Sequence, residues 1–86
     1  MLDAEFRSEE RFTRLSIAYD NQNEKKSVIS EVERIIARYS IQPETYTTAV
    51  SNGKEVLVIE YNDEISRESG TIFEEIIKAL NITKLI

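Results

Sequence analysis

The chain has 86 residues, of which 41% are hydrophobic and 31% charged, and its formal net charge at pH 7 is −5. This length suits one globular domain with a small core. The chain contains no cysteine, no histidine and only two glycines. It therefore lacks a thiolate nucleophile, sulfur ligands for zinc, the side chain best suited to proton transfer at neutral pH, and a glycine-rich phosphate loop. We expect no enzymatic activity, no catalytic residues, no metal and no cofactor.

Apolar runs in this sequence are shorter than the roughly 18 residues that a membrane-spanning helix needs. The first residues, MLDAEFRSEERF, mix acidic and basic side chains without an apolar segment, which argues against a secretory leader. The sequence therefore predicts a cytoplasmic protein. We expect residues 1–11 to form an N-terminal arm, either flexible or an extra edge strand, and residues 12–86 to form a single domain.

The spacing of apolar residues predicts two elements in the first half of the chain. Residues 12–19 alternate between apolar and polar side chains, which is typical of a half-buried strand. Residues 24–39 carry apolar side chains three and four positions apart, which indicates an amphipathic helix. Asn21 or Asn23 can cap this helix, and it should end before Pro43.

Asn52-Gly53, a strong signal for a β-hairpin, predicts a two-residue turn between strands at residues 45–51 and 54–61. In the register that this turn sets, Ala49 lies opposite Val56. The face expected to point toward the core carries Tyr46, Thr48, Val50, Leu57, Ile59 and Tyr61. The face expected to point away carries Thr45, Thr47, Ala49, Val56, Val58 and Glu60.

A second helix is predicted from about residue 71 to residue 80, with Thr71 and Glu74 in capping-box spacing at its start. Residues 83–86, TKLI, are expected to form a short final strand. The sequence thus predicts an α+β ferredoxin-like split βαβ sandwich, with two helices on one face of a four-stranded antiparallel sheet. In topology this resembles RNA-recognition and ACT-type regulatory domains, and that fold supports many unrelated functions.

Direct nucleic-acid binding is not expected. Val56, Val58 and Glu60 occupy the solvent-side positions where an RNA-recognition domain presents aromatic rings to the bases. The net charge of −5 also opposes contact with phosphates.

Acidic residues are concentrated between residues 60 and 75, where six acids and one base give a net charge of −5. Solvation and the helix macrodipole are one explanation for this segment. The alternative is a surface for a protein partner, especially a basic one. The residues predicted to bind that partner are Glu60, Asp63, Glu64 and Glu68.

The sheet face without helices is expected to carry a small apolar strip, because two helices cover only one face. Covering this strip with a second copy of the chain would give an isologous homodimer. The residues predicted for this dimer face are Ala18, Ala49, Val56 and Val58.

These features predict a small non-enzymatic protein-binding or regulatory module that acts through an acidic surface and a self-associating sheet face. One alternative is an acidic inhibitor of a nucleic-acid-binding protein, since small phage-type antagonists are similar in size and charge. Another alternative is an ACT-like sensor domain that binds a small ligand. No membrane partner is expected.

Overall fold

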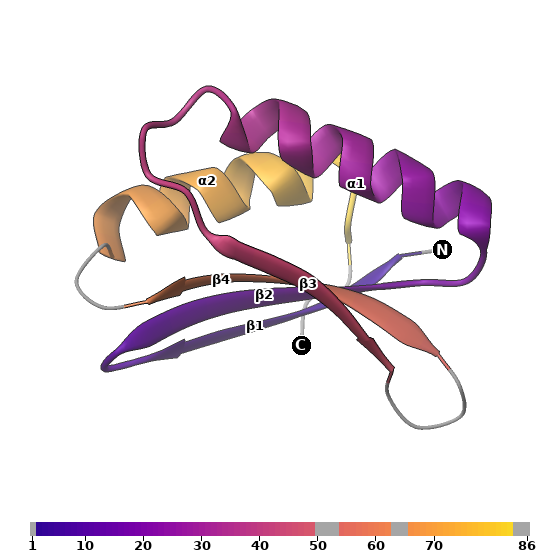
Figure 1. Ribbon diagram of the computed structural model, residues 1–86, viewed down its shortest axis with the longest axis horizontal. Helices are drawn as coiled ribbons and strands as arrows, with labels where there is room; N and C mark the ends of the chain where they lie inside the picture. Colours follow the sequence, from indigo (N-terminus) through magenta and orange to yellow (C-terminus); the bar gives the residue numbers. More distant parts are fainter. Residues whose placement is uncertain (1, 50–53, 63–65, 84–86) are drawn as a thin grey trace.

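The computed structural model describes residues 2–49, 54–62 and 66–83, with residues 66–68 described by their backbone alone. Two strands are followed by one helix, and this order is then repeated (Figure 1). The elements are β1 (Asp3–Glu9), β2 (Phe12–Tyr19), α1 (Gln22–Ile36), β3 (Glu44–Ala49), β4 (Glu55–Asn62) and α2 (Ser66–Ala79).

Four antiparallel strands form one sheet in the order β1-β2-β4-β3, and both helices lie on the same face of it (Figure 1). This is an α+β sandwich with a ferredoxin-like layout, as the sequence predicts. The edge beside β2 is occupied by β1, so Asp3–Glu9 is part of the sheet. Residues 84–86 of the expected final strand lie outside the described residues, and Thr83 belongs to neither a helix nor a strand.

Strand β1 pairs with β2 along its whole length, with Phe6 opposite Leu15. Its helix-facing side is anchored by Ala4, which is 3% exposed, and by Phe6, whose ring lies edge-on to the ring of Phe73 at a centroid distance of 5.9 Å. The other positions of β1 are mostly charged. Strand β1 is therefore held by its pairing with β2 and by the contacts of these two side chains with the core.

The core lies between the central strands and the two helices. Leu15, Ile17 and Ile59 are fully buried, and Phe73 of α2 packs against Tyr61 at a ring-centroid distance of 5.6 Å. The full core cluster comprises Ala4, Leu15, Ile17, Tyr19, Val28, Val32, Ile35, Ile36, Leu57, Ile59, Tyr61, Ile72, Phe73, Ile76 and Ile82.

Helix α1 is capped by the first of the two predicted candidates, Asn21. Its side chain accepts a hydrogen bond from the backbone of Glu24 at 2.9 Å, and Glu24 accepts one from the backbone of Asp20 at 2.7 Å. The pair resembles a capping box, except that Glu24 accepts from the residue before the cap and not from the cap itself. At the other end, the Gln42 side chain donates to the carbonyl oxygen of Ile36. Ile36 is the last helical residue, three residues before the predicted end, and its carbonyl also accepts from the Tyr39 N–H at 3.0 Å.

Helix α2 begins at Ser66, so Thr71 lies inside the helix and the predicted start there is wrong. The helix ends in a Schellman motif. The Ile82 N–H donates to the Ile77 carbonyl at 3.0 Å, and Asn81 adopts a left-handed conformation with φ of 55°. Neither described helix is long and apolar enough to cross a membrane.

Strands β3 and β4 pair one residue away from the predicted register. Ala49 lies opposite Glu55 instead of Val56, a pairing that the predicted two-residue turn does not produce. A shift of one residue moves every side chain of a strand to the other face. The predicted core-facing positions of Tyr46 and Thr48 are therefore wrong, and both lie on the open face. Asn52-Gly53 lies outside the described residues.

Candidate functional site

Of the four acidic residues predicted to bind a partner, the structure describes the side chain of one. Glu60 lies on the open face of β4 and accepts a hydrogen bond from the Tyr46 hydroxyl at 3.3 Å. Asp63 and Glu64 lie outside the described residues, and Glu68 is in α2 without a described side chain. Only Glu60 can be placed, beside the edge strand β3.

The predicted dimer face is changed by the register of β3. Ala18, Val56 and Val58 do share the open face. Ala49 lies on the helix face, so its assignment to the strip is wrong. Val56 and Val58 are only 9% and 4% exposed. The exposed apolar area that motivated a homodimer is therefore small, and the dimer stays a prediction.

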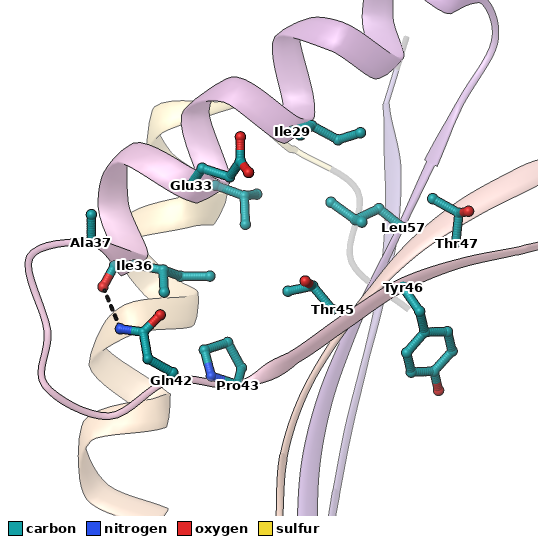
Figure 2. A pocket seen from close by; sticks show the side chains of 11 residues that line it. Ile29, Glu33, Ile36, Ala37, Gln42, Pro43, Thr45, Tyr46, Thr47 and Leu57 are labelled. Carbon is teal, nitrogen blue, oxygen red and sulfur yellow. Dashed lines mark hydrogen bonds between the residues drawn. The ribbon is translucent and has the colours of Figure 1, made fainter.

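A groove of about 460 Å³ runs between α1 and β3 (Figure 2). It forms because α1 packs mainly against α2 and β2, which leaves β3 without a helix over it. Thr45 and Thr47 point toward the α1 side in Figure 2, whereas Tyr46 points away. The apolar lining of the groove comprises Ile29, Val32, Ile36, Ala37, Pro43 and Leu57.

The two edges of the sheet differ in how their strands are protected from pairing with another chain. Strand β1 carries charge at every second position, and Arg7 forms an ion pair with Glu9 at 3.1 Å. Such charges discourage the addition of another strand. All six residues of β3 are exposed, and Glu44 at its start is its one charged residue. The β3 edge is therefore the more open template for pairing.

Acidic residues lie near β3 on both faces of the sheet, one in the groove and two on the opposite face. Glu33 lies in the α1 wall of the groove, and neither Glu33 nor Glu44 takes part in an ion pair among the described residues. By register, Glu44 and Glu60 lie opposite each other on the face away from α1. Like charges placed opposite each other are unfavourable, so a basic group placed near them would be stabilising.

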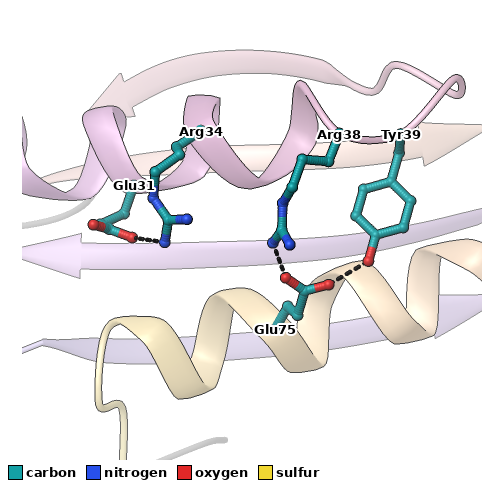
Figure 3. Close-up of polar contacts among 5 residues, drawn as sticks. All are labelled: Glu31, Arg34, Arg38, Tyr39 and Glu75. Carbon is teal, nitrogen blue, oxygen red and sulfur yellow. Dashed lines mark hydrogen bonds and ion pairs between the residues drawn. The ribbon is translucent and has the colours of Figure 1, made fainter.

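Beyond the end of α1, a polar cluster fixes the position of the helix that forms the groove wall (Figure 3). Arg38 and Tyr39 both donate hydrogen bonds to Glu75 of α2. The Tyr39 hydroxyl, and then the Arg38 guanidinium, lower the pKa of Glu75 below its ordinary value. Glu75 belongs to the acidic segment of the sequence, but its charge is satisfied within the chain.

A second cluster holds the start of α1 on the sheet. Lys25 lies 2.8 Å from Glu55 of β4, and the Tyr19 hydroxyl also donates to Glu55. Hydrogen bonds from Lys25 and Tyr19 lower the pKa of Glu55. Burial of Tyr19, followed by its contact with Glu55, raises the pKa of Tyr19 to about 12. Both ends of α1, which forms one wall of the groove, are thus tied to neighbouring elements by polar contacts.

Within residues 2–49, 54–62 and 66–83, no three acidic residues lie close enough together to hold a metal ion. Comparison of the chain with models of known protein families, with curated proteins and with solved structures gave no match.

Sequence reasoning missed the groove, and the signal that was available is the composition of β3. The strand ETYTTA has no aliphatic residue larger than alanine on either face. A strand with so little to bury is not expected to be covered by a helix. Ile29 of α1 and Leu57 of β4 line the resulting gap because of the position at which α1 docks on the sheet. The sequence pattern does not specify that position.

Proposed function

We propose that this protein is a non-catalytic protein-binding module that takes an extended segment of a partner protein as an additional strand along β3. The observation that supports the proposal is a fully exposed edge strand bordering an apolar groove. In strand addition, backbone hydrogen bonds supply affinity, and pockets for alternate side chains supply specificity.

The chemistry of the site defines the partner segment. Side chains of an added strand would point alternately to the two faces of the sheet. Those facing α1 would enter the groove over Ile29 and Val32, so they should be apolar. Those facing the other way would lie beside Glu44 of β3, with Glu60 one strand further away on β4, so basic residues are favoured there. The proposed partner segment alternates apolar residues with polar or basic ones.

The proposed binding surface is acidic, as expected from the sequence, but it lies along β3. Glu60 belongs to both versions. An acidic inhibitor of a basic protein is compatible with the same surface, because the partner is defined by its alternating apolar and basic residues. The charges of Glu44 and Glu60 should raise the association rate of a basic partner segment and make it sensitive to salt.

The test uses the peptide Lys-Val-Thr-Val-Thr-Val-Lys and a reordered peptide, Lys-Val-Val-Thr-Thr-Val-Lys, of identical composition. Peptide binding is measured by NMR titration of the labelled protein, with hydrogen exchange of the β3 amides as a second readout. We expect the alternating peptide to bind at least tenfold more tightly than the reordered one and to slow exchange in β3.

Two lysine substitutions in β3 provide a matched pair. Thr47→Lys places a charge on the side that lines the groove, whereas Thr48→Lys places it on the open face one residue away. The first should weaken binding about tenfold or more, since it introduces a charge where an apolar side chain would enter. The second should weaken it much less. Equal losses in both variants, or protection confined to β1, would contradict the proposal.

A second copy of the chain is the other occupant that the β3 edge admits. Light scattering of the wild-type protein and of Thr47→Lys decides this point. If the wild-type protein is a dimer and Thr47→Lys is a monomer, the groove holds a second copy, and the proposal of a separate partner is wrong.

A further inference from the structure

The open face of the sheet carries a second concavity, on the opposite side of β3 from the groove. It is a shallow hollow of about 430 Å³ that crosses all four strands. The residues that define its chemistry are Arg14, Ser16, Ala18, Tyr46, Val56 and Val58.

Arg14 stands out among the polar residues of this hollow. Its Nε atom is buried and has no hydrogen-bond acceptor among the described residues, and none of the ion pairs among those residues includes it. Glu60 lies directly opposite in register but accepts from the Tyr46 hydroxyl instead. A buried donor without an acceptor is costly, and such groups in native proteins call for an explanation.

The guanidinium of Arg14 is also held in place. Its central carbon lies 4.7 Å from the centroid of the Phe12 ring, a cation–π contact that limits the orientations of the side chain. A planar guanidinium fixed on a ring is suited to a carboxylate, which it can bind through parallel hydrogen bonds. The hydroxyl of Ser16, two residues along the same face, also borders the hollow and can add a donor.

The remaining surfaces of the hollow restrict the ligand further. Ala18, Val56 and Val58 offer an apolar floor next to Arg14. Asp3 and Glu5 of β1 also line the hollow, where they lie directly opposite Ala18 and Ser16 of β2. Together with the net charge of −5, these two carboxylates disfavour a ligand with a second negative charge, such as phosphate or a dicarboxylate.

We propose that this hollow is a binding site for a small monocarboxylate with a short apolar body. The carboxylate pairs with Arg14, and the body lies on Val56 and Val58. This site is separate from the groove beside α1 and does not depend on the proposed partner binding. Its volume falls within the range of small-molecule sites in proteins.

The first experiment needs no variant. Sodium butanoate, butanamide and disodium glutarate are titrated separately into labelled wild-type protein, and amide chemical shifts are followed by NMR at constant ionic strength. Butanoate should produce saturable shifts centred on Ser16, Ala18 and Val58. Butanamide, which has a similar size and no charge, and glutarate, which has a second carboxylate, should each bind at least fivefold more weakly. Equal binding of butanoate and butanamide would overturn the proposal.

The second experiment compares Arg14→Gln with Arg7→Gln. Arg7 lies directly opposite Arg14 on β1 and already pairs with Glu9, so it is a matched control of the same charge. Arg14→Gln should abolish the saturable butanoate shifts, whereas Arg7→Gln should change the affinity less than twofold. Butanoate shifts that persist in Arg14→Gln would refute the site.

The carboxylate that pairs with Arg14 could also come from an acidic side chain of a second copy of the chain. Light scattering of the same proteins tests this alternative. We expect wild type and Arg14→Gln to have the same mass. If wild type is a dimer that Arg14→Gln dissociates, Arg14 pairs with the other copy, and the small-molecule proposal is wrong.

Discussion

At the scale of single residues, Tyr19 links the packing of the core to the behaviour of the protein at alkaline pH. Its ring is 5% exposed, and its hydroxyl donates to Glu55. Ionisation would place a buried phenolate beside a carboxylate, which is why the pKa is raised from 10.0 to about 12. The folded state therefore favours the neutral form of Tyr19.

The consequence is a stability contribution that depends on pH. Since the pKa is higher in the folded state, this contribution is complete below pH 10 and is lost as the pH rises from 10 to about 12. Tyr19→Phe cannot ionise, so its stability deficit relative to wild type should shrink over that range. Urea unfolding at several alkaline pH values, with the exposed Tyr46→Phe as control, measures this effect. A deficit that stays constant with pH would contradict the assignment.

At the scale of the secondary-structure elements, Gly70 makes α2 less stable than alanine at that position would. It is exposed in the interior of the helix, and a Cβ atom built on it would meet no heavy atom within 4 Å. Glycine costs helix stability because its backbone is freer in the unfolded chain. Gly70→Ala should therefore stabilise the protein by about 0.5–1 kcal/mol in urea or thermal unfolding. A loss of stability would show that α2 needs a glycine there.

The elements that the sequence predicted best are those with a strong apolar period. The alternating residues 12–19 match the bounds of β2, and α1 begins within two residues of the predicted start. Strand β1 was harder to recognise because its buried face carries only Ala4 and Phe6. The predicted start of α2 is five residues too late, because Thr71 and Glu74 have capping-box spacing although both lie inside the helix.

The candidate sites were predicted less well than the fold, and the register of β3 is the main reason. The assumed two-residue turn set a pairing that is wrong by one residue, so Ala49, Tyr46 and Thr48 were assigned to the wrong faces. The groove depends on where α1 docks, and the hollow depends on the failure of Arg14 to pair with Glu60. Neither property is encoded in the spacing of residues along one element.

At the scale of the whole molecule, the burial of Val58 bears on whether the open face stabilises the single chain or forms a dimer interface. Its side chain is 4% exposed in the single chain. Val58→Asn would place an amide on the apolar floor of the hollow, which should cost about 1–3 kcal/mol of unfolding free energy. We expect an unchanged mass by light scattering and a lower urea midpoint. A change from dimer to monomer at constant stability would restore the predicted dimer face.

Strand β3 separates the two proposed sites by the thickness of one backbone. Thr45 and Thr47 border the groove, Thr48 borders the hollow, and Tyr46 borders both. A ligand that holds β3 from one face would reduce the conformational entropy that a second ligand must remove from the other face. Occupation of the two sites would then be linked by a coupling free energy, and that coupling is reciprocal. If a carboxylate tightens the binding of a partner strand by some factor, the partner strand must tighten the binding of the carboxylate by the same factor.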